Sequence, residues 1–318
     1  MILLSFKPLL ISEGRVVSRP VAAIRSFDEA GYTNIAELTQ AHDSRKRQDI
    51  LRQAIKWTVY ALLLINWGYY IFDDWRVARH TLDAGEPLLQ WMNAYATSID
   101  ELAWFALLFL FELETYWLSD AALTRVRRFI FVGIRLACYG FLLHTLYAYG
   151  FSYLEIVDAV LLPSATTACE LAGQDFSFLR NLLYTDIGAG NCNALSAGGA
   201  LFQIGGDSVI TDTAGLAEYR GLAIIDIVEA TVWLAVIIII ELVVVLQERG
   251  TSAGKLISRS NYLTIGLYSI LVSVALYWIW KGHYVYAWDE LLWIGGFAAI
   301  EMNLSEWRDE LDAAAVHN

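Results

Sequence analysis

The strongest constraint on the fold of this chain is a series of apolar stretches, each about twenty residues long and almost free of charge. A helix of roughly 20 apolar residues crosses the ~30 Å hydrocarbon core of a lipid bilayer. The sequence therefore predicts an all-α integral membrane protein with about six transmembrane helices. The predicted spans cover residues 55–73, 100–119, 129–150, 222–246, 262–280 and 287–304.

The composition supports this class. Hydrophobic residues make up 57% of the 318 residues, and the mean hydropathy is +0.46. Only 18% of the residues are charged, whereas a soluble domain carries about 25%. The net charge is −12, with no basic patch longer than a few residues. We therefore expect the lipid bilayer as a partner and no nucleic acid.

The distribution of Lys and Arg predicts the orientation in the membrane. Sixteen of the 22 basic residues lie before residue 57, between residues 120 and 128, between 247 and 261, or after residue 304. Five lie in the opposite loops, and Arg135 lies inside a span. Basic residues collect on the cytoplasmic side of membrane proteins. The chain is thus predicted to keep both termini in the cytoplasm, with a bacterial inner membrane as its expected location.

The spans and the segments between them define the predicted domains. Residues 1–53 are mixed in charge and are predicted to form a cytoplasmic N-terminal extension. Residues 54–304 then form the membrane domain, and residues 305–318 form a cytoplasmic tail.

A long outer loop is predicted over residues 151–221. Its first part, residues 153–163, is apolar but too short to cross a bilayer, so we expect a surface or re-entrant helix that ends at Pro163. Cys169 and Cys192 both lie in this loop, where an oxidising compartment permits a disulfide. Such a bridge would favour a packed cap over a flexible loop; two free thiols are the alternative.

Three alternate spans share a pattern. Each contains an acid, a tryptophan four residues later, and a glutamate eight residues after the tryptophan. The pattern predicts three pseudo-repeated helical hairpins, an arrangement found among membrane transport proteins. The three sets are Asp100–Trp104–Glu112, Glu229–Trp233–Glu241 and Asp289–Trp293–Glu301.

The spacing places the two acids of each set at different depths. The first acid shares a helix face with the tryptophan near the outer interface, so an outer acidic ring is expected from Asp100, Glu229 and Asp289. The glutamate follows the tryptophan by ~12 Å along the helix. This distance places the three glutamates inside the hydrocarbon region, where a charged carboxylate is costly and commonly functional.

These deeper glutamates are the predicted ion site. Glu112, Glu241 and Glu301 would lie at one level, with Arg135 on the third span as their counter-ion. Close carboxylates repel, so such a cluster requires shared protons, a bound cation or the arginine. The alternative is structural: each glutamate could be hydrogen-bonded to a neighbouring helix and only hold the bundle together.

No motif of a known chemistry is present. The chain lacks a P-loop, a dinucleotide-binding glycine pattern, HExxH and CxxC. The sequence does not indicate a catalytic residue, a cofactor or a metal, although His283 with Asp289 and Glu290 is one alternative for an outer metal site.

Two function classes are consistent with these features. The first is a membrane channel or transporter for a cation or proton, which uses the carboxylates of the second, fourth and sixth spans. The second is a non-catalytic scaffold or accessory subunit, either as a homo-oligomer or within a larger membrane complex.

Overall fold

The structure is a computed structural model, which describes residues 30–83, 85–113, 124–163, 165–195, 199–206, 208–248 and 255–297. Most of these residues are helical, as the sequence predicted. Residues 284–297 form a helix that follows α7 after a short turn. The main helices before it are α1 (Ala30–Thr81), α2 (Leu88–Ala94), α3 (Ala96–Glu112), α4 (Arg125–Val157), α6 (Thr213–Glu248) and α7 (Lys255–Lys281).

The chain divides into two compact units. The first unit covers residues 7–65, and its described part belongs to helix α1. The second contains the chain from Asn66 onward, with the rest of α1 and all later elements. The fold and the site below concern this second unit.

Three helices in the described part of the chain are long and apolar enough to cross a membrane. They are residues Arg125–Val157 in α4, Thr213–Val243 in α6 and Tyr262–Lys281 in α7. The pair α2 and α3 gives a fourth candidate if its two helices count as one span bent by 76°. The chain is therefore a membrane-associated helical protein.

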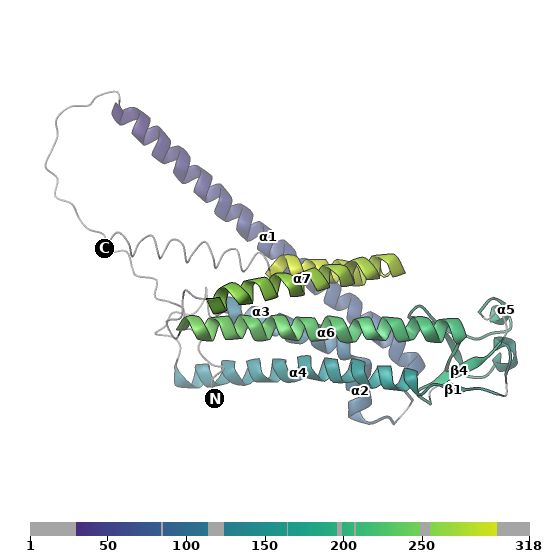
Figure 1. Ribbon diagram of the computed structural model, residues 1–318. Coiled ribbons are helices and arrows are strands. Elements are labelled where there is room, and N and C mark those ends of the chain that lie inside the picture. The colour runs from purple at the N-terminus through teal and green to yellow at the C-terminus, as the bar shows by residue number, and fades with distance from the viewer. Residues whose placement is uncertain are drawn as a thin grey trace. The chain divides into compact units, whose positions relative to one another are not determined.

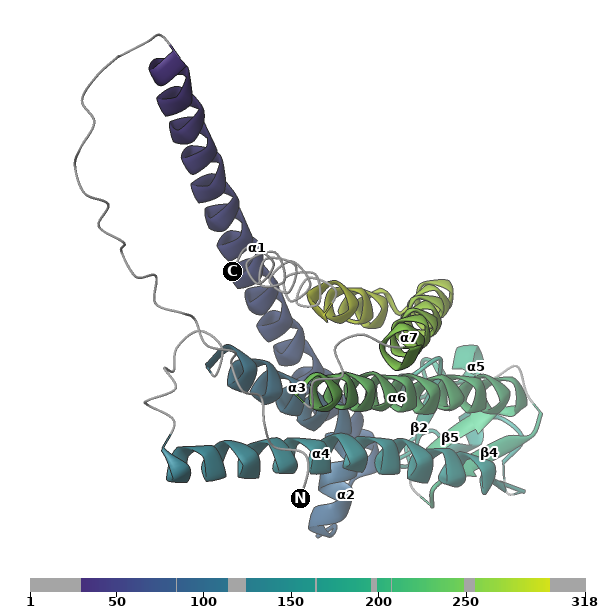
Figure 2. The same ribbon diagram turned by 60° about the vertical axis from the view of Figure 1, so that its left-hand side comes forward.

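Helices α4 and α6 pack side by side, and α4 ends and α6 begins at the same β-sheet (Figures 1 and 2). They contain 33 and 36 residues, so each is roughly 50 Å long at 1.5 Å per residue. A bilayer core is only ~30 Å thick. Each of these helices is therefore longer than a membrane crossing requires, and the sheet lies at one end of the pair.

The outer cap contains a β-sheet, which the predicted all-α fold did not include. Its five strands lie in the order β1–β4–β5–β2–β3, and every neighbouring pair is antiparallel except β2 with β5. The expected helix over residues 153–163 is wrong, because α4 continues to Val157 and β1 follows it. The strands are β1 (Val160–Leu161), β2 (Ser177–Arg180), β3 (Leu183–Asp186), β4 (Leu201–Ile204) and β5 (Val209–Asp212).

The predicted disulfide between Cys169 and Cys192 is present. It joins the short helix η3 (Ala168–Leu171) to α5 (Cys192–Leu195). Both elements pack on one face of the sheet, in a core that includes Phe178, Leu201 and Ile210. The segment is thus a packed cap rather than a flexible loop.

A second core joins the cap to the helices. Ile156 at the end of α4 and Leu216 at the start of α6 pack against Leu179, Ile204 and Val209 of the sheet. Because this core is continuous with the helices, the sheet has a fixed position on α4 and α6.

Candidate functional site

Two adjoining cavities share lining residues of α3 and α6. Helix α4 completes the lining of the first, and the helix over residues 284–297 completes that of the second. The volume that the centre of a water molecule can occupy is about 50 Å³ in the first cavity and about 40 Å³ in the second. One water needs roughly 10–15 Å³ by this measure. Each cavity therefore has room for several waters or a small ion.

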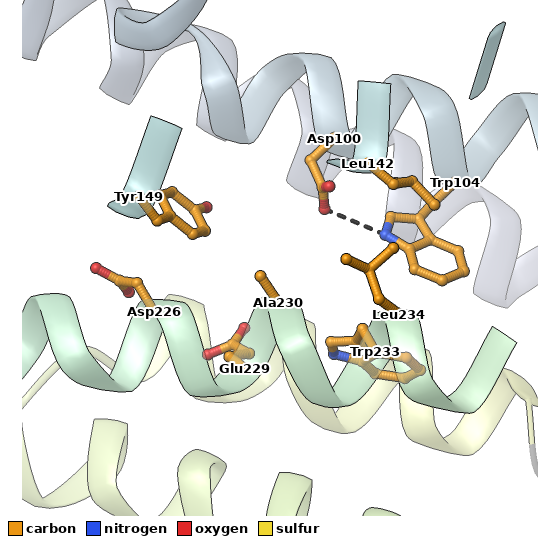
Figure 3. Close-up of a pocket in the computed structure, with 9 residues that line it drawn as sticks. All are labelled: Asp100, Trp104, Leu142, Tyr149, Asp226, Glu229, Ala230, Trp233 and Leu234. Atoms are coloured by element: carbon orange, nitrogen blue, oxygen red, sulfur yellow. Dashed lines mark hydrogen bonds between the residues drawn. The ribbon is translucent and has the colours of Figure 1, made fainter. Parts of the chain in front are cut away.

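Both cavities are lined in part by carboxyl groups. Figure 3 shows Asp226 and Glu229 of α6 facing the side that Asp100 of α3 and Tyr149 of α4 line. No Lys, Arg or His is among the described residues that line either cavity. The acids of the two cavities are Asp100, Glu101, Asp226, Glu229, Asp289 and Glu290, which we call the carboxyl cluster.

Tryptophan side chains supply hydrogen-bond donors to the cluster. Nε1 of Trp104 donates to Asp100 at 3.1 Å, and Nε1 of Trp233 donates to Glu290 at 2.9 Å. The other two donors are Trp278, 2.8 Å from Glu229, and Trp293, 3.3 Å from Glu101. A buried indole needs an acceptor for its N–H group, and here the carboxyl groups fill that role.

The tryptophan rings also contact one another. The centroid of Trp104 lies 5.7 Å from that of Trp233 and 6.0 Å from that of Trp293. Phe297 packs against all three rings. This aromatic layer lines one side of the cavities with apolar surface, which lowers the local dielectric constant and strengthens electrostatic interactions there.

Two carboxyl–carboxyl pairs lie within the cluster. Glu229 of α6 lies within hydrogen-bonding reach of Glu290, and Glu101 of α3 lies within reach of Asp289. Glu290 is only 2% exposed. Among the described residues, no N–H group and no hydroxyl group donates a hydrogen bond to its Oε1 atom. Two carboxyl groups in such contact repel one another when both are ionised, whereas a shared proton joins them by a hydrogen bond.

Helix α1 supplies two further donors. Nδ2 of Asn66 donates to Oδ1 of Asp289, and the hydroxyl of Tyr70 donates to Oδ2 at 3.3 Å. Both donors are buried. These bonds are neutral, so they orient Asp289 without providing a counter-charge.

The structure brings together the acids predicted as an outer ring. Asp100, Glu229 and Asp289 all line the second cavity, and the tryptophan that follows each of them by four residues lines it too. Their convergence makes this ring, rather than the deeper glutamates, the best-defined polar site in the described chain.

The deeper predicted site is described only in part. Glu241 accepts a hydrogen bond from the hydroxyl of Tyr139, which lies four residues after the buried Arg135 on α4. Glu112 is the last residue of α3. Glu301 lies outside the described residues, so a cluster of the three glutamates stays a prediction.

Of the other acids of the cluster, Glu101, Glu290 and Asp226, the sequence analysis named only Glu290, and only for the alternative outer metal site. A signal for the first two was available, because an Asp-Glu-Leu triplet precedes Trp104 as well as Trp293 at the same distance. Asp226 had no such signal; it lies one helical turn before Glu229 and enters the site only through the packing of α6 against α4.

The alternative of an outer metal site is wrong for the described residues. No group of three or more His, Cys, Asp or Glu side chains among them is arranged to hold a metal ion. His283 instead bonds to Asn181, with 3.0 Å between Nε2 and Oδ1.

Comparisons with protein-family models, with curated proteins and with solved structures give no match to this chain.

Proposed function

We propose that this chain is a membrane transport protein for protons, and that the carboxyl cluster is the site that binds and releases them. The observation that carries the proposal is the contact of carboxyl groups in two pairs, Glu229 with Glu290 and Glu101 with Asp289. The lining of these cavities offers no basic side chain among the described residues. Protons are the simplest positive charges that can join such pairs.

The energetics favour a functional over a merely structural role. Insertion scales assign about 2.5 kcal/mol or more to one charged carboxylate at the centre of a transmembrane helix. A bundle that needed only adhesion could use neutral hydroxyl or amide groups instead. Six acids in one place are costly to retain, and membrane proteins keep such groups mainly along ion and proton pathways.

The proposal includes six spans with both termini on one side of the membrane. Residues 55–73 of α1 and the helix that begins at residue 284 would add to the spans of α3, α4, α6 and α7. The meeting of Trp104, Trp233 and Trp293 supports the three-hairpin repeat, because equivalent positions of a pseudo-threefold bundle approach its axis.

The deeper glutamates fit this proposal as a second proton-binding site on the same pathway. Glu241, bonded to Tyr139 near Arg135, lies eight residues beyond Trp233 on the same helix. We propose that it passes protons between the carboxyl cluster and the other side of the membrane, together with Glu112 and Glu301.

Proton flux into proteoliposomes tests the proposal. The purified full-length chain should acidify vesicles under an imposed potential, and Glu229→Gln should reduce the rate at least about tenfold, because it replaces one partner of a proton-sharing pair. Asp175→Asn, in an exposed turn of the cap, is the matched control and should retain the flux.

Two results would contradict transport. One is the absence of proton flux from wild-type protein that is folded and inserted. The other is equal flux from Glu229→Gln and Asp175→Asn. A parallel scan with Na⁺ and K⁺ would show whether another cation replaces the proton at the cluster.

The second candidate function is that of an accessory subunit, and a separate observation supports it. Both edge strands of the cap expose apolar side chains: Val160 and Leu161 of β1 are 66% and 50% exposed, and Leu183 of β3 is 54% exposed. Unpaired sheet edges of this kind accept further strands. Crosslinking in native membranes would support this function if it captured one defined partner at β1 or β3.

A further inference from the structure

Two tyrosine–aspartate hydrogen bonds connect α1 to the helix over residues 284–297. We call the two bonds together the ladder, and each bond a rung. The hydroxyl of Tyr286 donates to Asp73 at 2.9 Å, and the hydroxyl of Tyr70 donates to Asp289 at 3.3 Å. Each tyrosine thus bonds to the acid that lies three residues after the other tyrosine. The two rings stack between these bonds, with centroids 5.8 Å apart and planes inclined by 29°.

The two rungs of the ladder lie at different depths. Asp73 follows Tyr70 on α1, which runs toward the β-sheet, where His80 contacts Ser177. Asp289 follows Tyr286 on a helix that runs away from the sheet, since His283 just before it contacts Asn181. The Tyr286–Asp73 rung is therefore closer to the sheet, and the Tyr70–Asp289 rung lies about one helical turn deeper. Asp289 belongs to the carboxyl cluster, so the ladder ends inside the candidate site.

His283 continues the ladder toward the sheet. Its ring stacks on Tyr286 with centroids 5.2 Å apart and planes inclined by only 9°. Beyond it lies Asn181, whose Oδ1 accepts from Nε2 of His283 and whose Nδ2 donates to the backbone carbonyl of Lys281 at 3.1 Å. His283 is partly exposed, whereas Tyr70 is 6% and Asp289 8% exposed. Burial thus increases from His283 to the cluster.

The β2–β3 turn covers this outer end. Its two central residues, Asn181 and Leu182, both have positive φ angles, 48° and 62°. Two successive positive φ values are typical of a tight type I′ hairpin, but a leucine there is rare. Leu182 compensates by packing against the cluster of Leu222 and Trp278. The turn is thus held in an unfavourable backbone conformation directly beside His283.

We propose that protons pass between the sheet-bearing side of the membrane and the carboxyl cluster through His283, the Tyr286–Asp73 rung and the Tyr70–Asp289 rung. This inference rests on the proposed function and adds the route by which the cluster exchanges protons. Of the side chains on this route, the acid spacing indicated only Asp289.

Each step moves one proton, and once a proton has reached Asp289 the other groups of the route are back in their starting protonation states. His283 accepts a proton on one ring nitrogen and releases the proton of the other. The hydroxyl of Tyr286 gives its proton to Asp73 and is reprotonated from the His283 side. The hydroxyl of Tyr70 then gives its proton to Asp289 and recovers one from the outer rung. No bond other than O–H and N–H bonds forms or breaks.

The charged groups around His283 are consistent with an imidazole that takes up and releases protons. Burial lowers the pKa of His283, the carboxylates of Asp73 and Glu218 act to raise it, and Lys281 acts to lower it. Lys281 is itself paired with Glu218 at 2.9 Å, and Asp73 with Arg76 at 3.1 Å. Tyr286 and Asn181 are its neutral neighbours. A neutral imidazole can take up a proton and pass it on near neutral pH.

Tyrosine-to-phenylalanine variants test the route, because each keeps the ring and removes only the hydroxyl. Tyr70→Phe and Tyr286→Phe should each lower proton flux in proteoliposomes at least about tenfold. Tyr284→Phe is the matched control, since Tyr284 lies in the same helix, is 68% exposed and is outside the ladder. Its flux should equal that of the wild type.

A second measurement distinguishes a blocked proton route from a disrupted carboxyl cluster. The infrared C=O band of protonated buried carboxyl groups should be present in wild type, in Tyr70→Phe and in Tyr286→Phe, and should weaken in Glu290→Gln. Low flux with an intact band identifies a blocked route. Low flux with the band lost means that the variants disrupted the cluster itself, and it overturns the inference.

The outcomes also distinguish this inference from the proposed function. Wild-type flux that is lost in Glu229→Gln but unchanged in both tyrosine variants overturns the route and leaves proton transport standing. Absence of flux from the wild type overturns both.

Discussion

Each tryptophan of the site contributes an indole N–H hydrogen bond to a carboxyl group as well as a large apolar ring. Trp278 is 1% exposed and donates its indole N–H to Glu229 at 2.8 Å. Without that donor, the remaining side-chain hydrogen-bond partner of Glu229 among the described residues would be another acid, Glu290. Buried polar groups that lose a partner cost about 1–3 kcal/mol, so a neutral donor is worth more here than on the surface.

Replacement of this donor should therefore destabilise the protein. Trp278→Phe is expected to lower the free energy of unfolding by about 2–4 kcal/mol, from the lost hydrogen bond and the smaller ring together. Thermal unfolding followed by circular dichroism checks this. Trp288→Phe is the control, because Trp288 is 50% exposed. Equal stability of the two variants would contradict the role given to the indole.

The junction between β5 and α6 shows how a secondary-structure element is fixed in place. Asp212 ends the strand and its Oδ1 accepts the backbone N–H of Gly215 at 2.7 Å, which caps the helix. The hydroxyl of Thr211 donates to the carbonyl of Leu179 at 2.8 Å. A Cβ atom on Gly215 would lie only 2.1 Å from that hydroxyl oxygen. The residue must be glycine for the helix to start this close to the sheet.

Two glycine-to-alanine substitutions in α6 should therefore have opposite effects. Gly215→Ala should destabilise the protein by at least about 1–3 kcal/mol, since the added methyl group displaces Thr211. Gly221→Ala meets only the Tyr277 hydroxyl, at an ordinary 3.6 Å, and should stabilise the helix by about 0.5–1 kcal/mol. Chemical denaturation of both variants would test the pair, and a loss of equal size in both would count against the explanation.

At the scale of the whole molecule, the cap has a core of its own on one face of the sheet, closed by the disulfide, while a second core joins it to α4 and α6. The disulfide closes a loop with a sequence separation of 23 residues. A crosslink of that length stabilises by about 3 kcal/mol in the chain-entropy description. Because part of the cap's core is separate from the helices, we expect loss of the disulfide to loosen the cap while the helices stay packed.

Removal of the disulfide should act mainly on the cap. In Cys169→Ala/Cys192→Ala we expect faster hydrogen exchange across η3, α5 and the strands, with little change in α4 and α6. Mass spectrometry of peptides from the two regions measures both rates. Cys138→Ala, which changes a buried cysteine of α4, should leave exchange in the cap unaltered. Uniformly faster exchange in cap and helices alike would show that they unfold as one unit.

The sequence by itself determined the features that depend on local composition. Apolar windows identified the helices of α4, α6 and α7, because the cost of placing charge in hydrocarbon acts on each segment separately. The two cysteines of the outer loop predicted their own bridge, and the acid–tryptophan spacing identified three of the six acids of the cluster.

Only the tertiary structure decided which of these groups meet. Strands of two to four residues form the cap sheet, and such short segments carry too little periodicity to be predicted. The pairing of Glu229 with Glu290, and of Tyr70 with Asp289, joins residues far apart in the chain. Contacts of this kind depend on how helices pack and rotate against one another, and no local pattern in the sequence encodes that.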